Sequence, residues 1–250
     1  MKFILAVAFR EYRIRLTNPI LPLWDVLVPV VYLLVFGASL ERWLGLGATG
    51  TDYPTFFLAG VLSMVTFSIA MNSSYAFFED LQSGVFHEIL TYPFPRRDLL
   101  LGKLLFNAAL GVVGALVCVA AGILVLKVDL ALAALPALML WVALGTAAWY
   151  FLFSWFSLQM RGFNTYHTTT SAMYLLLMFI SNLFYPADRL PEGVVWLARA
   201  NPITWQTDLL RYHAYGAVSP QLAQWEAAAF VAFVLGCFWL ANHKLNGTIE

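Results

Sequence analysis

Long apolar runs, separated by shorter polar segments, set the pattern of this chain. An α-helix needs about 20 apolar residues to cross a hydrocarbon core of about 30 Å. The runs that meet this length are 22–42, 53–78, 99–126, 132–158, 164–184 and 222–242. The run at 99–126 carries no charge after Lys103, and the run at 132–158 carries none at all. The pattern predicts an all-α integral membrane protein with six transmembrane helices.

The first run, 22–42, departs from this pattern at two positions. Asp25 lies near one end of the run, and Pro29 lies inside it. A carboxylate is costly in hydrocarbon, and a proline interrupts the hydrogen bonding of a helix. We therefore expect Asp25 at the level of the lipid headgroups and a kink at Pro29.

Residues 1–18 show helical spacing instead of a continuous apolar run. Apolar side chains recur at i, i+4, i+7 and i+11, in Leu5, Phe9, Tyr12 and Leu16. The basic residues lie largely elsewhere around the helix, at Lys2, Arg10, Arg13 and Arg15. This spacing predicts an amphipathic helix that lies in the membrane interface and ends at Asn18-Pro19. The pattern leaves open whether the helix is an anchor or a moving part.

The segment 79–98 is a compact charged stretch between the second and third apolar runs. Residues 80–91 suit one short helix with Leu81, Val85 and Ile89 on a single stripe. Pro93 and Pro95 then prevent the helix from continuing. Such a helix predicts a docking surface for a partner outside the bilayer, and the alternative is an ordinary loop with a solvated charged face.

A second polar stretch, 185–221, precedes the last apolar run and is divided by prolines. It predicts two short helices, at 194–199 and 204–215. Trp196 and Trp205 have the amphipathic rings that favour a membrane interface. These helices are expected at the outer boundary of the membrane, either dipping into it or forming a passive lid.

Composition agrees with a membrane protein. Hydrophobic residues make up 61% of the 250 residues, charged residues make up 11%, and the mean hydropathy is +0.76. A net charge of zero argues against a nucleic-acid partner, since phosphate-binding surfaces are basic. Cys118 and Cys237 fall inside predicted helices, and the histidines lack the spacing of metal ligands. The sequence therefore indicates neither a disulfide framework nor a metal site.

The distribution of Lys and Arg predicts the orientation of the chain. The proposed crossings divide the basic residues into one larger set, Lys2, Arg10, Arg13, Arg15, Arg96, Arg97, Lys103, Arg161 and Lys244, and one smaller set, Arg42, Lys127, Arg189, Arg199 and Arg211. Positive charge collects on the cytoplasmic side of membrane proteins. Both termini and the segment 79–98 are therefore predicted to be cytoplasmic, in a cytoplasmic (inner) membrane.

Two sets of residues within the predicted helices are candidates for a translocation path. The polar set is Asn72, Ser73, Thr165, His167 and Thr169, and the aromatic set is Trp149 and Phe153. Polar groups in a membrane usually face protein or a water-filled path, and aromatic faces suit sugar rings, planar drugs and lipid tails. Hydrogen bonds within one helix and ordinary packing are the alternative explanations.

The order of these parts resembles an ABC-2-type permease, the membrane subunit of a class of ATP-driven exporters. The resemblance covers essentially the whole chain and rests on Phe57-Leu-Ala-Gly60, on Glu79, Gly84, Glu88, Leu90, Pro93, Arg96, Gly102 and Lys103, and on Asn201-Pro202 through Arg211. It implies that 1–18 is the gate helix, with Leu5, Phe9, Arg10, Tyr12, Arg13 and Leu16. It also implies that 79–98 is the segment that docks on the ATPase, with Glu79, Asp80, Leu81, Gly84, Val85, Glu88, Ile89, Pro93 and Arg96.

The resemblance further implies that partners drive the transport cycle. The sequence contains no Gly-x-x-x-x-Gly-Lys-Ser/Thr motif, so this chain is expected to be a non-catalytic subunit without a cofactor. ATP and Mg²⁺ are expected on two copies of a separate ABC ATPase. A second permease copy or a paralogue is expected to complete a dimer within membrane lipid.

The expected function is export of an amphipathic, lipid-type or glycan-type substrate or drug by alternating access. One alternative is an ion-coupled secondary transporter, although no clear inverted repeat or pair of broken helices is present. The other alternative is a membrane-embedded lipid-modifying enzyme. Its acids would have to come from Glu79, Asp80, Glu88 and Asp98, which lack the spacing of metal ligands.

Overall fold

The computed structural model describes residues 2–44, 52–92, 95–186 and 189–247, and this part of the chain contains helices and no strand. In chain order the helices are α1 (Lys2–Thr17), α2 (Ile20–Leu44), α3 (Tyr53–Gln82), α4 (Val85–Leu90), α5 (Arg96–Leu126), the 3-10 turn η1 (Leu132–Ala134), α6 (Leu135–Ser157), α7 (Phe163–Ile180), α8 (Glu192–Ala200), α9 (Pro202–Tyr215) and α10 (Pro220–Gly247). The predicted all-α class is confirmed.

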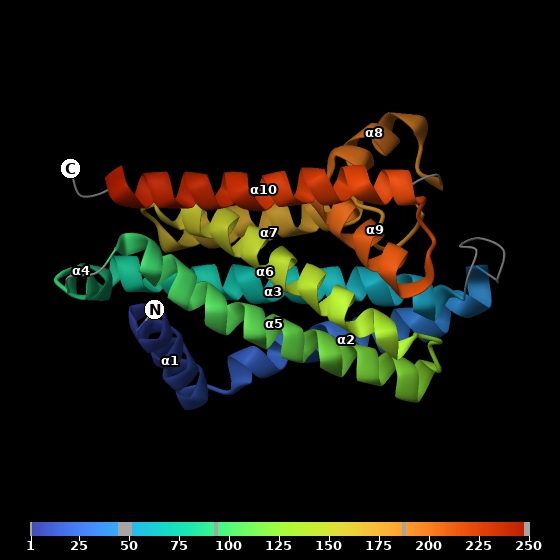
Figure 1. Ribbon diagram of the computed structural model, residues 1–250, viewed down its shortest axis with the longest axis horizontal. Coiled ribbons are helices and arrows are strands. Elements are labelled where there is room, and N and C mark those ends of the chain that lie inside the picture. Colours follow the sequence, from blue (N-terminus) through green and yellow to red (C-terminus); the bar gives the residue numbers. More distant parts are fainter. Residues whose placement is uncertain (1, 45–51, 93–94, 187–188, 248–250) are drawn as a thin grey trace.

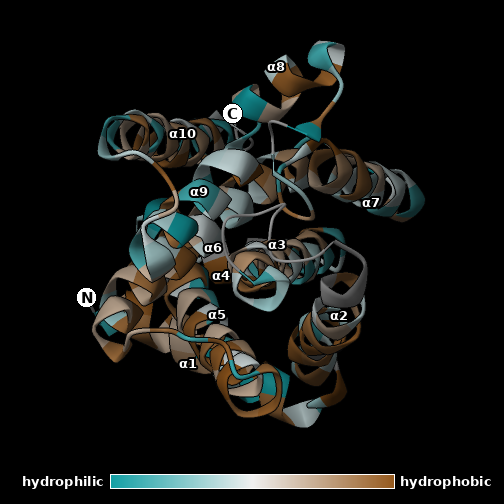
Figure 2. Ribbon diagram, turned by 90° about the vertical axis from the view of Figure 1, so that its right-hand side faces the viewer, coloured by the Kyte–Doolittle hydropathy of each residue, from teal (hydrophilic) through white to brown (hydrophobic). Residues whose placement is uncertain are grey.

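Helix α3 forms the centre of the bundle. The helices α2, α5, α6 and α9 pack around it, and Figure 2 shows α3 near the middle of the molecule. Phe57, Val61 and Val65 on α3 are completely excluded from solvent. A helix that is apolar on all sides is stable only when it is covered on all sides, which explains the central position of α3.

Five helical segments are long and apolar enough to cross a membrane: Pro22–Leu40, Tyr53–Gln82, Arg96–Leu126, Leu132–Ser157 and Pro220–Gly247. They correspond to five of the six predicted runs. The remaining run, 164–184, coincides with α7, which ends at Ile180 and is not among the five. The first half of α7 carries Asn164, Thr165 and His167, and these polar residues lower its mean hydropathy.

The bundle has two different ends. Figure 1 shows α4, the beginning of α1 and the end of α10 at one end, and α8 and α9 towards the opposite end. We call these the α4 end and the α9 end. The two predicted short helices of 185–221 correspond to α8 and α9, and α9 is embedded in the bundle because it packs on α3, α6 and α10.

The amphipathic pattern of α1 separates two faces of this helix. Leu5, Phe9, Tyr12 and Leu16 are between 47% and 58% exposed. Glu11 and Arg15 are buried on the face that packs on α5. The apolar stripe of α1 is therefore free to contact lipid.

The single helix predicted over 80–91 is wrong. Instead, α3 continues to Gln82, and α4 begins only at Val85. Gly84 separates them with a backbone φ of +81°, which glycine adopts without the steric cost that other residues pay. As a result, Asp80 and Leu81 belong to the last turn of the central helix.

Candidate functional site

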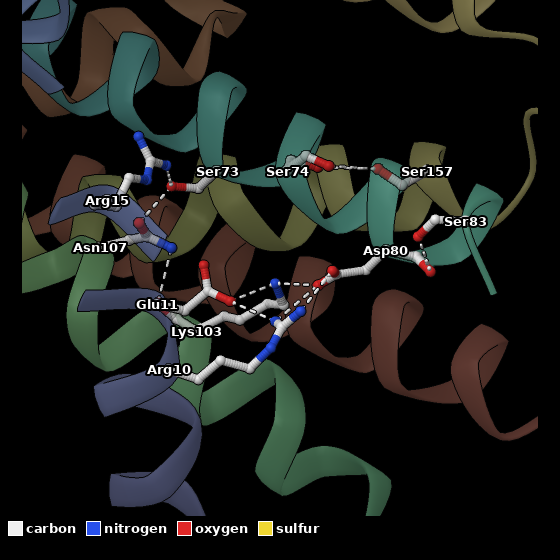
Figure 3. A network of polar contacts seen from close by, with 10 residues as sticks. All are labelled: Arg10, Glu11, Arg15, Ser73, Ser74, Asp80, Ser83, Lys103, Asn107 and Ser157. Atoms are coloured by element: carbon white, nitrogen blue, oxygen red, sulfur yellow. Dashed lines mark hydrogen bonds and ion pairs between the residues drawn. The ribbon is translucent and has the colours of Figure 1, made fainter. Parts of the chain in front are cut away.

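Four charged side chains meet at the α4 end, where α1, α3 and α5 come together (Figure 3). Arg10 on α1 donates two hydrogen bonds to the carboxylate of Asp80 on α3, at 2.8 and 3.0 Å. Lys103 Nζ on α5 donates to Asp80 Oδ2 at 2.7 Å and to Glu11 Oε1 at 2.6 Å. Arg10 Nη1 also donates to Glu11 Oε1 at 3.1 Å. We call these four residues the charge cluster.

The charge cluster is electrically balanced and largely buried. Lys103 is 1% exposed and Glu11 is 2% exposed, and each has an opposite charge within hydrogen-bond distance. The two negative charges of its acids and the two positive charges of its bases cancel. The hydrogen bond to Asp80 raises the pKa of Arg10 above its usual value, so this guanidinium stays charged. A buried pair of this kind resists separation, because either partner alone would be an uncompensated buried charge.

A close approach of two helices brings the charge cluster together. Gly102 lies against α1 so tightly that a Cβ atom there would come within 2.5 Å of Val7 Cβ and 2.8 Å of the Ile4 carbonyl oxygen. Because Gly102 has no side chain, the backbone of α5 packs directly against Val7 of α1. Lys103, the next residue, is thereby placed beside Glu11.

A chain of polar contacts continues from the charge cluster along the inside of the bundle (Figure 3). Asn107 Nδ2 donates to the Lys103 carbonyl oxygen at 2.8 Å, and Ser73 Oγ donates to Asn107 Oδ1. Arg15 Nη2 donates to Ser73 Oγ at 3.0 Å. The same three helices, α1, α3 and α5, are thus joined at two levels.

Asp25 on α2 extends this network. Its carboxylate is 1% exposed, accepts hydrogen bonds from Ser68 at 3.1 Å and from Asn72, and lies 3.7 Å from Arg15. The carboxylate thus contacts protein, and its position at the level of the lipid headgroups stays a prediction. Asp25 faces protein because Arg15 and two polar residues of α3 compensate its charge.

A cavity of about 700 Å³ and another of about 660 Å³ open from the described part of the chain. The second lies between α1, α3 and α7 and is lined in part by Arg15, Asn72, Glu79, Tyr75 and His167. Two of the predicted path residues, Asn72 and His167, therefore face one shared space. We call this space the α7 cavity.

The other predicted path residues lie elsewhere. Ser73 is buried in the polar chain described above, while Thr165 is exposed on α7. Trp149 and Phe153 are fully packed against Phe67 of α3, with ring centroids 4.7 and 5.0 Å away, and line neither cavity. Their spacing on α6 reflects the core between α3 and α6. Thr169, also on α7, is half-buried and lines neither cavity.

The predicted docking residues divide into buried and exposed positions. Leu81 and Ile89 are half-buried against the core, and Phe86, which the sequence did not single out, is 1% exposed beside Phe77. Glu79, Glu88 and Tyr92 are exposed. The half-buried Val85 opens α4, and Pro93 lies outside the described residues. The sequence predicted an apolar stripe as the docking surface. In the structure, Leu81 and Ile89 of this stripe pack partly on the core, and the acids Glu79 and Glu88 are exposed.

Arg96, another predicted docking residue, contacts the last helix. Its Nη1 donates to the carbonyl oxygens of Leu245 and Asn246 at 3.3 and 2.9 Å. A cation at the C-terminal end of a helix pairs with unsatisfied carbonyl groups there. Arg96 thus fastens the beginning of α5 to the end of α10.

Glu11, Lys103, Asn107 and Asp25 were not among the predicted site residues. One signal for Glu11 was present, since it is the single acid in a basic amphipathic helix and lies away from the apolar stripe. No periodicity in the sequence pairs it with Lys103.

The fold and the site define a multi-pass α-helical membrane protein whose helices are joined by a buried charge cluster at one end. A family model described as ABC-2 type transporter matches residues 2–215, which include α1 to α9. The chain therefore belongs to the ABC-2 type transporter family, as a membrane permease of ABC transporters. A search of curated proteins gives no significant match.

Proposed function

We propose that this permease is the membrane subunit of an ATP-driven exporter, and that the charge cluster transmits movement from α4 to α1. A separate ABC ATPase binds the α4 end, and its ATP-dependent closure displaces α4. The ion pairs from Lys103 to Glu11 and Asp80 carry this proposal.

The position of the charge cluster supports the proposed transmission of movement. Asp80 lies in the last turn of α3, and Lys103 lies early in α5, so α4 is flanked by both. Asp80 accepts hydrogen bonds from Arg10 of α1, and Lys103 donates one to Glu11, the next residue of the same helix. Separating a buried ion pair costs several kcal/mol, about 3 to 5. When α4 moves the ends of α3 and α5, α1 therefore moves with them.

The distribution of charge supports a cytoplasmic α4 end. Arg10, Arg15, Arg96 and Lys103 all belong to this end, where α10 also ends (Figure 1). Helix α7 completes a sixth crossing in this proposal. Phe163, at the beginning of α7, contacts the ring of Tyr75 on α3. Near the α9 end, the Leu177 carbonyl oxygen of α7 accepts a hydrogen bond from Asn201.

A second copy or a paralogue is proposed to cover α7 and α2. Leu175, Leu176 and Phe179 on α7 are each more than half exposed, as is Val35 on α2. These exposed apolar side chains are free to contact lipid or the apolar side chains of a second copy. A dimer across these side chains would place two α7 cavities beside a common path.

The α7 cavity is proposed to receive cargo from the cytoplasmic side. Its lining combines Arg15 and Glu79 with the aromatic ring of Tyr75 and with Asn72 and His167. It therefore suits a molecule with both polar and apolar parts. Arg15 also belongs to the polar network of α1, so movement of α1 would reshape this cavity and support alternating access.

The decisive experiment is co-purification of the tagged permease from native membranes, followed by ATPase measurement. We expect a nucleotide-binding subunit to be recovered with the wild-type chain and lost with Glu88→Arg on α4. The matched control is Glu192→Arg, which reverses an exposed acid on α8 at the opposite end. Recovery of the permease alone, without ATPase activity in any preparation, would contradict the proposal and favour an ion-coupled carrier.

A further inference from the structure

The cavity at the α9 end has no role in the proposed transmission of movement. It has a volume of about 700 Å³ and lies between α9, the beginning of α10 and the segment that follows α7. Cavities that bind small molecules usually have volumes of about 300 to 1,000 Å³. We call it the outer cavity.

Three buried side chains of the outer cavity retain a polar atom without a hydrogen-bond partner in the described part of the chain. They are Asn182, Arg211 and Glu226, which are 2%, 3% and 7% exposed. The unpartnered atoms are Asn182 Oδ1, Arg211 Nε and Glu226 Oε2, and the hydroxyl of the half-buried Tyr215, which also lines the cavity, is unpartnered as well. Because an unsatisfied buried polar atom is costly, four of them around one cavity indicate a bound molecule.

The other polar atoms of these residues hold the cavity in shape. Arg211 Nη2 donates to the Asn182 carbonyl oxygen at 2.9 Å, and Arg211 Nη1 donates to Asp208 at 3.3 Å. Asn182 Nδ2 donates to the same Asp208 oxygen at 2.7 Å. The Arg211 guanidinium also lies 3.7 Å above the ring of Phe56. The side chains of Asn182 and Arg211 are therefore already fixed in place.

The chemistry of the unpartnered atoms restricts the class of ligand. Arg211 Nε is a donor, whereas Asn182 Oδ1 and the carboxylate oxygen of Glu226 are acceptors. An ammonium group only donates, and a phosphate mainly accepts, so neither satisfies the full set. A hydroxyl group both donates and accepts. The lining contains both acidic and basic side chains, namely Asp208 and Glu226 together with Arg199 and Arg211.

Aromatic rings complete the lining. Trp205 is held in place by a 2.6 Å hydrogen bond from its Nε1 to the Arg199 carbonyl oxygen. Trp225 lines the same cavity and is 77% exposed. Indole faces suit the apolar faces of sugar rings. A neutral molecule with many hydroxyl groups fits both the rings and the mixed donors and acceptors.

We propose that the outer cavity binds a neutral saccharide unit, which stacks on Trp225 and forms hydrogen bonds with Asn182, Arg211 and Glu226. A free saccharide and the headgroup of a membrane glycolipid offer the same chemistry. The site requires neither ATP nor a partner subunit. Its test is therefore separate from that of the proposed transport cycle.

The test is saturation-transfer NMR on the full chain in lipid nanodiscs, which avoids competition from glycoside detergents. The probes are maltose, choline and glucuronate, that is, a neutral, a cationic and an anionic molecule. We expect transfer to maltose above both others. A parallel titration of maltose into nanodiscs with and without glucosyl-diacylglycerol distinguishes a free saccharide from a glycolipid headgroup as the ligand. If the site prefers the headgroup, the glycolipid competes with maltose and weakens its apparent binding.

The matched variants are Trp225→Ala and Trp196→Ala. Trp196 on α8 is 75% exposed, similar to Trp225, but does not line the cavity. We expect maltose binding to be lost in Trp225→Ala and kept in Trp196→Ala. Glu226→Gln, which replaces one carboxyl oxygen by an amide NH2 group, should weaken maltose binding about fivefold. Equal losses in both tryptophan variants, stronger transfer to choline or glucuronate, or no transfer to maltose would each overturn the proposal.

Discussion

Lys103 Nζ lies 2.7 Å from Asp80 Oδ2, so the beginning of α5 is ionically bound to the end of α3 on either side of α4. The same ammonium group lies 2.6 Å from Glu11 Oε1 on α1. One buried side chain therefore connects three helices. Its removal should affect both the stability of the bundle and the communication between its parts.

Lys103→Met should destabilise the protein strongly. The substitution keeps most of the side-chain volume but leaves Glu11 without its closest cation, at a cost of about 3 to 5 kcal/mol. Thermal unfolding in mild detergent measures the effect. Lys244→Met, at an exposed position of α10, is the control and should unfold near the wild-type temperature. Equal unfolding temperatures for the two variants would show that the buried ion pairs contribute little.

Arg10→Gln should uncouple transport from ATP hydrolysis with little loss of folding. It removes the paired hydrogen bonds to Asp80, which join α1 to α3, while Asp80 keeps its ion pair with Lys103. We expect ATPase activity in the reconstituted complex to persist and cargo transport to fall at least several-fold. Arg13→Gln, an exposed arginine of the same helix, is the matched control. A proportional loss of both activities would point to misfolding instead.

Gly102→Ala should weaken the packing of α1 on α5. The added Cβ atom would lie 2.5 Å from Val7 Cβ, so the helices must separate, at a cost of about 1 to 3 kcal/mol. Protection of a cysteine introduced at the buried Val7 position, measured by thiol labelling, reports the separation. Gly236→Ala on α10 meets no atom within 4 Å and should leave labelling unchanged. If both variants label at the same rate, the close approach does not hold α1 in place.

Gly84→Ala should disturb the turn between α3 and α4. A residue with a Cβ atom at a φ of +81° is strained by about 1 kcal/mol or more. Because α4 would change its direction, we expect weaker retention of the ATPase in co-purification. Gly193→Ala, in another short helix and with open space around it, is the control. Unchanged retention in Gly84→Ala would mean that the turn does not set the docking surface.

The comparison of sequence and structure is clearest in the segment 79–98. The charged composition and the prolines correctly indicated a short helix between two apolar runs. However, the stripe of Leu81, Val85 and Ile89 suggested one continuous helix, because helical periodicity does not register a single residue with positive φ. Gly84 divides the segment, and Asp80 thereby becomes part of the buried charge cluster.

The sequence by itself determined the features that depend on local composition. The apolar runs required a multi-pass helical membrane protein, and the spacing of Leu5, Phe9, Tyr12 and Leu16 defined the exposed stripe of α1. Only the tertiary structure decided which polar groups meet. Lys103 and Glu11 are separated by 92 positions, and Arg211 and Phe56 come from different helices. Contacts between such distant positions depend on the packing of helices in space, and a local pattern of hydrophobic residues carries no information about them.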